Sequence, residues 1–247
     1  MDRVRSSGFP TTAWTVVARA RSGADTEARE ALAFLCAAYW LPLYSFARRL
    51  GNASEDALDL TQGYFALLIE KDYLADVRLR EGRFRAFLLT SFRHFVSKER
   101  DCARALKRGG GRAPLSIDAA EAEGRYAEQP LDALDPEALF ERRWALTILE
   151  RAMARLRQEF AGAGRKAEFE QLETYLTGSE PRVQYQGAAE RLGTTEGAIK
   201  KMVHRLRRRY GQVLREEIGA TVADPAEIDA ELRHLLAAVR PWEPPTT

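Results

Sequence analysis

Helical periodicity is the feature that most constrains how this 247-residue chain can fold. Apolar residues recur every three or four positions through most of the sequence, and Ala, Leu, Arg and Glu far outnumber Val and Ile. Both properties favour helices over strands. Glycine ends some periodic segments, as at Gly51, and the pair Asp135-Pro136 supplies a helix cap followed by a first-turn proline. We therefore predict an all-α fold.

The expected helices fall into two groups with a linker between them. They cover residues 26–50, 54–72, 84–108, 136–160, 166–176, 184–192, 196–217 and 225–239. Between the groups, a triple glycine, two prolines and many acidic residues without a helical period predict a flexible acidic linker. The predicted organisation is a small helical domain at 1–108, the linker at 109–135, a second helical domain at 136–218 and a helical extension at 219–247.

Composition and motif content exclude several classes of protein. Cys36 and Cys102 lie far apart, so we expect neither a disulfide framework nor a cysteine zinc site. The three histidines share no ligand spacing, and no P-loop or nucleophile elbow occurs, so we expect no metal, no cofactor and no enzymatic activity. No apolar run approaches the roughly 18 residues of a membrane span, and no signal peptide is visible. We therefore expect a cytoplasmic protein that does not bind a membrane.

The most specific local pattern is a helix-turn-helix near the carboxyl end. Apolar residues within 185–192 lie on one face of a short helix, Gly193 ends it, and Thr195 is placed to cap the next helix. That second helix carries lysine and arginine opposite its apolar stripe, and residues 200–215 include no acid. Solvated helix faces usually mix signs, because like charges four residues apart repel each other. The uniform charge therefore indicates a polyanionic partner such as DNA.

A second basic helix is expected at 84–108, in a chain whose charges are segregated. Residues 78–112 hold 11 basic and 3 acidic side chains, whereas residues 113–141 hold 1 basic and 8 acidic ones. Phenylalanine interleaved with arginine is typical of proteins that stack the bases and neutralise the phosphates of a single strand. The preceding helix is acidic, which either balances charge within the domain or docks a basic protein partner. Charge alone leaves both readings open.

Three stretches of the sequence, taken together, resemble bacterial RNA polymerase sigma factors of the extracytoplasmic-function (ECF) type, in a divergent branch. They are EDALDLTQ at 55–62, GRFRAFLLTSFRHFVSKERDCARALKR at 82–108 and AAERLGTTEGAIKKMVHRLRRRY at 188–210. The stretches occur in the family's order, with an acidic linker between the second and the third. The resemblance extends over residues 26–110 and 137–218.

The resemblance implies a role for each stretch. The acidic helix would bind the clamp of the polymerase through Asp56, Asp59 and Gln62. The basic helix would melt the promoter and read its minus-ten element through Arg83, Phe87, Arg93, Arg100 and Arg104. The carboxy-terminal helix would enter the major groove of the minus-thirty-five element through Thr195, Glu196, Lys200, Lys201, His204, Arg205 and Arg208.

The function expected from this resemblance is that of a sigma factor, which binds RNA polymerase core enzyme and directs promoter recognition, DNA melting and transcription initiation. The alternative is a stand-alone helix-turn-helix regulator whose amino-terminal domain senses a ligand or forms a dimer. Three candidates for restraining the activity stay open: an anti-sigma factor, a regulatory kinase, and the extension at 219–247.

Overall fold

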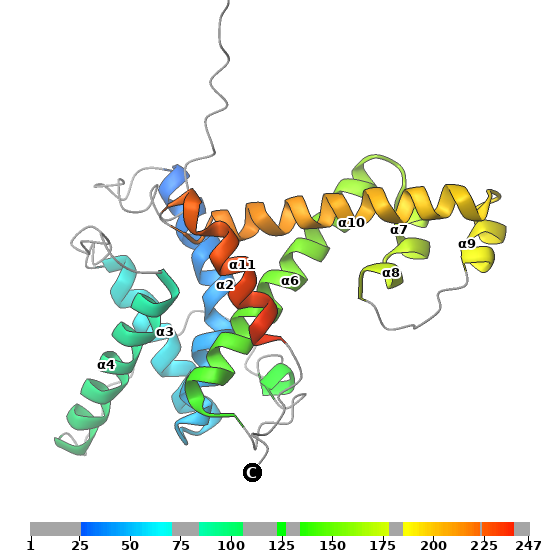
Figure 1. The fold of residues 1–247 in the computed structure, drawn as a ribbon. Helices are drawn as coiled ribbons and strands as arrows, with labels where there is room; N and C mark the ends of the chain where they lie inside the picture. The colour runs from blue at the N-terminus through cyan, green and yellow to red at the C-terminus, as the bar shows by residue number, and fades with distance from the viewer. Residues whose placement is uncertain are drawn as a thin grey trace, which may run out of the picture. The chain divides into compact units, whose positions relative to one another are not determined.

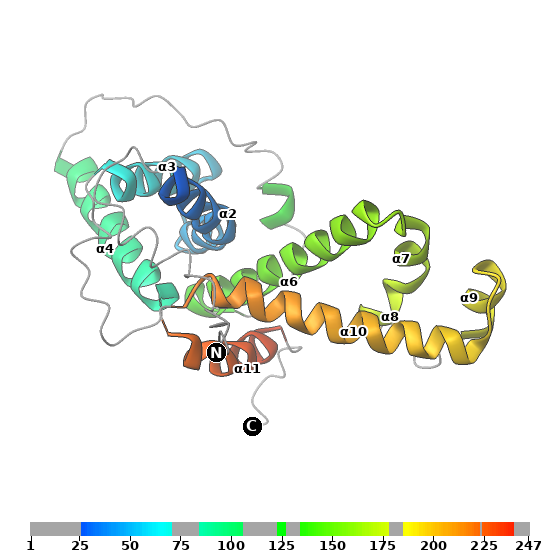
Figure 2. The same ribbon diagram turned by 90° about the horizontal axis from the view of Figure 1, so that it is seen from above.

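The fold is all-α, as predicted (Figure 1 and Figure 2). The computed structural model describes residues 26–70, 84–105, 123–126, 134–177, 185–222 and 224–239, and no strand occurs in these ranges. The helices are α2 (Thr26–Arg49), α3 (Ser54–Glu70), α4 (Phe84–Ala105), α6 (Pro136–Gly162), α7 (Lys166–Leu172), α8 (Thr174–Thr177), α9 (Tyr185–Arg191), α10 (Glu196–Gly219) and α11 (Ile228–Ala238), with a 3-10 turn, η1, at Pro225–Glu227.

Local sequence explains where several helices begin and end. The Asp135 carboxylate accepts a hydrogen bond of 2.7 Å from the backbone amide of Ala138 and so caps the start of α6. Asp224 caps η1 in the same way, at 2.9 Å. Gly51 follows α2 with φ +87°, a conformation that favours glycine because it has no Cβ. These boundaries were visible in the sequence as cap and stop residues.

The described residues divide into two compact units. The first contains the residues up to Thr147 and from Ile218 onward, and the second contains Ile148–Glu217. This division differs from the predicted domains, because residues 136–147 and α11 group with α2, α3 and α4. The part of the predicted extension that the structure describes is therefore an integral part of the first unit.

In the first unit, α2, α3 and α4 pack against one another (Figure 1). Aromatic side chains lie between these helices. The ring centres of Tyr64 on α3 and Phe92 on α4 lie 5.1 Å apart, and those of Tyr39 on α2 and Phe84 on α4 lie 5.3 Å apart. All four side chains are buried. Such aromatic pairs each contribute about 0.5–1.5 kcal/mol beyond the burial of their area. This core fixes the helices on which the sequence placed the polymerase-binding and minus-ten residues.

A short piece of the predicted linker is packed onto the first unit. Residues 123–126 form a helical turn, and the Glu123 carboxylate accepts hydrogen bonds from Tyr44 Oη at 2.5 Å and from Arg48 Nη2 at 2.6 Å. Hydrogen bonding from Arg48 is the main cause that lowers the pKa of Glu123. The Arg48 guanidinium also lies 5.1 Å from the centre of the Tyr126 ring. The prediction of a flexible linker does not hold for these four residues.

The second unit is built on the apolar face of α10. Ile199, Val203 and Leu206 lie on this face and are at most 2% exposed, which confirms the predicted stripe. Buried Phe169 of α7 faces Phe160 of α6, with 5.3 Å between the ring centres. With its apolar face covered, α10 leaves its opposite face to solvent.

Candidate nucleic-acid interface

A tight turn joins α9 to α10 and fixes the amino-terminal end of α10 (Figure 1). The Thr194 amide donates a hydrogen bond of 2.9 Å to the Ala189 carbonyl, and Gly193 adopts φ +61°. The Thr195 hydroxyl then accepts a hydrogen bond of 3.2 Å from the Ala198 amide, so the predicted cap of α10 is confirmed. Two helices joined by a glycine-containing turn of this length have the form of a helix-turn-helix.

The outward face of α10 is cationic and exposed. Lys201 and His204 are three residues apart, and His204 and Arg208 are four residues apart, so the three share one face of the helix. This face lies opposite the one that carries Ile199 and Val203. All three side chains are exposed, and within the described part of the chain none of them has a hydrogen-bond or ion-pair partner. Exposed lysine and arginine side chains without an acidic partner, such as Lys201 and Arg208, are free to neutralise phosphates.

The other residues predicted for the minus-thirty-five element flank this face. Lys200 Nζ lies 5.5 Å from the centre of the Tyr185 ring of α9, and Arg205 lies on the side of α10 that faces α6 and α7. Thr195 and Glu196 form the exposed amino-terminal end of the helix. The structure therefore brings all seven predicted residues to the exposed surface of one helix and its cap.

Arg207 and Arg209, two other arginines of α10, have structural partners. Arg207 donates a hydrogen bond of 3.0 Å to the Tyr175 carbonyl. Arg209 donates two hydrogen bonds to the Glu159 carboxylate of α6, at 2.8 and 2.6 Å. Hydrogen bonding from Arg209 lowers the pKa of Glu159, and the same interaction raises the pKa of Arg209. Thus Arg207 and Arg209 stabilise the second unit, whereas Lys201 and Arg208 are exposed to solvent.

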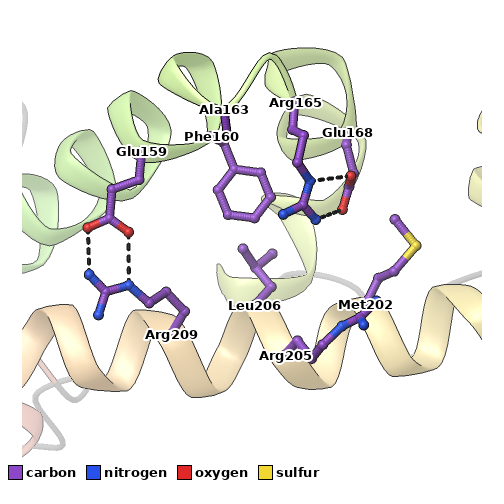
Figure 3. A pocket seen from close by; sticks show the side chains of 9 residues that line it. All are labelled: Glu159, Phe160, Ala163, Arg165, Glu168, Met202, Arg205, Leu206 and Arg209. Atoms are coloured by element: carbon purple, nitrogen blue, oxygen red, sulfur yellow. Dashed lines mark hydrogen bonds and ion pairs between the residues drawn. The ribbon is translucent and has the colours of Figure 1, made fainter.

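An open pocket of about 560 Å³ borders α10 on the side of α6 and α7 (Figure 3). Its lining consists of an apolar centre and charged edges: Glu159, Phe160, Ala163, Arg165, Glu168, Met202, Arg205, Leu206 and Arg209. Figure 3 shows Phe160 and Leu206 between the ion pairs Glu159–Arg209 and Arg165–Glu168. These pairs compensate the charges of the pocket except at Arg205.

The arginines of α4 are arranged differently from those of α10. Arg93 is half-exposed and forms an ion pair with Glu137 at the start of α6. Arg100 is half-buried and donates hydrogen bonds of 3.0 Å to the Leu50 carbonyl and to Asn52 Oδ1, in the connection between α2 and α3. The sequence predicted that both would lie along the promoter backbone, but in this structure both guanidinium groups are engaged within the first unit.

Of the other residues predicted for the minus-ten element, the structure describes the side chain of Phe87 but not those of Arg83 and Arg104. Phe87 is half-buried, and its ring centre lies 6.4 Å from that of buried Phe84, so it is not a free stacking platform. Arg83 lies outside the described residues, and the Arg104 side chain lies outside them as well. The exposed charged side chains of α4 include both signs: Arg93, Lys98, Glu99 and Asp101.

Sequence reasoning missed a buried ionic cluster at the start of α4. Arg85 is 4% exposed and forms ion pairs with Glu141 of α6, at 2.5 Å, and with Glu231 of α11. Its guanidinium carbon lies 4.3 Å from the centre of the Trp144 ring. Burial disfavours the charge of Arg85, but the two carboxylates outweigh this effect and raise its pKa. The sequence held a signal, because Arg85 lies three residues before Leu88 on the apolar stripe of α4.

Of the residues predicted to bind the polymerase, two are exposed and one is buried. Asp56 and Asp59 are exposed on the first turns of α3. Gln62 is only 7% exposed, so it does not present its side chain to a partner, and the prediction is wrong on this point. The reason is its register, since Gln62 lies four residues after Leu58 and three before the buried Phe65.

Comparison with known proteins gives no match: no protein-family model, no curated protein and no solved structure matches this chain. Within the residues that the structure describes, no three His, Cys, Asp or Glu side chains group closely enough to hold a metal ion. None of the described helices has both the length and the apolar character needed to cross a membrane.

Proposed function

We propose that this protein is a cytoplasmic sigma factor of the ECF type, which binds RNA polymerase core enzyme and directs promoter recognition, melting and transcription initiation. The observation that carries the proposal is the exposed, unpaired cationic face of α10, set at the second helix of a helix-turn-helix. The order of the three sequence motifs that resemble sigma factors adds support.

In this proposal, α10 enters the major groove of promoter DNA. Lysine and arginine contacts to phosphate fix the register of a protein on the duplex, while side chains near the start of the recognition helix contact base edges. Lys201 and Arg208 would supply the phosphate contacts, and Lys200, His204 and Arg205 would lie nearest the bases. The chain itself performs no covalent step and needs no cofactor.

The polymerase would dock on α3, where the exposed carboxylates of Asp56 and Asp59 fit a basic protein surface. Docking would hold α10 near the promoter, so that weak contacts to DNA add through a raised effective concentration. A sigma factor of this kind binds promoters tightly only together with the core enzyme.

A stand-alone helix-turn-helix regulator is the second candidate. The observation that favours it is the internal use of Arg85, Arg93 and Arg100, which leaves the first unit with fewer free cations than the resemblance implies. Such a regulator would bind a duplex site without polymerase, and its first unit would bind a ligand or a second copy of the chain.

In vitro transcription with purified core enzyme over genomic fragments distinguishes the two functions. A sigma factor starts RNA at defined sites only when chain and core enzyme are both present. The variant Asp56→Asn with Asp59→Asn should lose core binding and initiation, whereas Glu99→Gln with Asp101→Asn removes the same charge from exposed sites of α4 and should keep both. Tight duplex binding without the core enzyme, together with no RNA in its presence, would overturn the sigma proposal in favour of the regulator.

A further inference from the structure

Carboxylates of α6 and α11 neutralise two arginines of α4. Glu137 and Glu141 lie one turn apart on α6 and pair with Arg93 and Arg85 respectively. Glu231 of α11 supplies a second carboxylate to Arg85. The two helices that carry these acids are separated by more than sixty residues of sequence, yet both contact the amino-terminal half of α4.

The contact between Arg85 and Glu231 is almost fully buried. Arg85 is 4% exposed and Glu231 is 2% exposed, and the Trp144 ring covers the guanidinium at 4.3 Å. His234, one turn further along α11, contacts the Glu141 carboxylate at 2.9 Å. α11 therefore contributes two contacts to the cluster, one to Arg85 and one to Glu141.

Carboxylate and phosphate bind a guanidinium through the same donors and with the same geometry. An arginine that holds two carboxylates in a buried site cannot also bind the phosphate of a nucleic acid. Release of α11 would remove one of the two carboxylates that pair with Arg85, which lies two residues before Phe87 on α4.

We propose that α11, acting with Glu137 and Glu141 of α6, is an intramolecular inhibitor of α4, and that a nucleic-acid strand binds α4 only when these carboxylates are displaced. This inference rests on the proposed function, because it takes α4 to be the strand-binding helix of a sigma factor. It assigns a regulatory role to the chain that follows the helix-turn-helix.

The affinity of the full-length chain for a fluorescently labelled single-stranded oligonucleotide, measured by anisotropy, tests the proposal. Glu231→Gln weakens the contact to Arg85 and should tighten binding by about fivefold. Asp229→Asn removes the same charge from an exposed site of α11 and should leave the affinity unchanged. In the double variant Arg85→Gln with Glu231→Gln, the gain should disappear while circular dichroism shows a folded chain, because the freed guanidinium is missing.

A second variant keeps the test valid if Glu231→Gln unfolds the first unit. Glu137 is half-exposed in its pair with Arg93, so Glu137→Gln should keep the fold and tighten binding by about twofold. Hydrogen exchange should show faster exchange in α11 of Glu231→Gln while α2 and α3 stay protected. Unchanged affinity in the folded variants, or a gain that persists without Arg85, would overturn the proposal.

Transcription assays on the same proteins separate this proposal from the proposed function. If the wild-type chain starts RNA with core enzyme but neither variant binds the oligonucleotide more tightly, the inhibitor is refuted and the sigma function stands. If the variants bind more tightly and no protein starts RNA, the inhibitor stands and the sigma function is refuted.

Discussion

α4 and α10 are both basic amphipathic helices, yet they use their cations in opposite ways. On α10, Lys201 and Arg208 are exposed, and the described residues offer them no acidic partner. On α4, Arg85 and Arg100 are buried or half-buried and hold neighbouring elements through ion pairs and hydrogen bonds. The comparison shows that the charge counted along a helix differs from the charge available to a ligand.

The difference has a cause in register. Arg85 and Arg100 fall on the side of α4 that also carries Leu88, Phe92 and Val96, so the fold carries them toward its interior. A buried guanidinium requires carboxylates or carbonyls around it. The lysine and arginine residues of the outward α10 face lie opposite the apolar stripe. Because this face does not pack against the described helices, no acidic side chain is held next to these residues.

The largest effect should come from removing Arg85. Arg85→Gln leaves two carboxylates without their cation in a largely buried site, and we expect the free energy of unfolding to fall by about 3–5 kcal/mol. Arg208→Gln on the outward face of α10 should change it by less than about 0.5 kcal/mol. Urea unfolding followed by circular dichroism measures both values. Equal losses for the two variants would contradict the distinction between the helices.

The next effect concerns duplex DNA. Lys201→Ala with Arg208→Ala should weaken binding by about tenfold, because both cations are free in the unbound chain. The slope of log affinity against log salt concentration should also fall by about two, since two phosphate contacts are lost. Arg207→Ala removes a cation that holds the Tyr175 carbonyl, and it should lower stability more than DNA affinity. Anisotropy titrations at several salt concentrations provide the measurement. An unchanged salt dependence in the double variant would remove α10 as the binding surface.

A smaller loss of stability is expected when Arg100 of α4 is replaced. Arg100→Ala removes hydrogen bonds to the Leu50 carbonyl and to Asn52, and we expect a loss of about 1 kcal/mol in the free energy of unfolding. Lys98→Ala, an exposed change two residues away, should be nearly neutral in stability. If duplex DNA affinity fell for Arg100→Ala while stability did not, Arg100 would act on DNA as the sequence predicted.

The smallest effect is the pH dependence of the Glu159–Arg209 pair. Its hydrogen bonds hold the pKa of Glu159 below the ordinary value of 4.5 in the folded chain. The pair therefore stabilises the fold above that value, and the contribution disappears as the pH falls through the lowered pKa. Because both groups are about one-third exposed, Glu159→Gln should cost about 0.5 kcal/mol at pH 7. The difference between the thermal melts of the two proteins should shrink as the pH falls below 4.5; a constant difference would contradict this assignment.

Much of the fold could be predicted from periodicity and caps. The start of α6 after Asp135 and the cap of α10 at Thr195 follow from local chemistry, which depends on a few neighbouring residues. The grouping of α11 with the first unit could not be predicted, because it depends on Glu231 meeting Arg85 across 146 residues of sequence. The α10 surface was predictable because exposure there follows from a single helix, whereas burial of Gln62 and Arg100 depends on the register against other helices.

The most direct measurement is photo-crosslinking of the chain to duplex DNA in the absence of polymerase. A photoreactive phenylalanine is placed at His204 on the outward face of α10 or at Ser97, an exposed site on α4. We expect crosslinks to the duplex from position 204 and none above background from position 97. Crosslinks from position 97 with none from position 204 would contradict the assignment of the duplex-binding surface to α10.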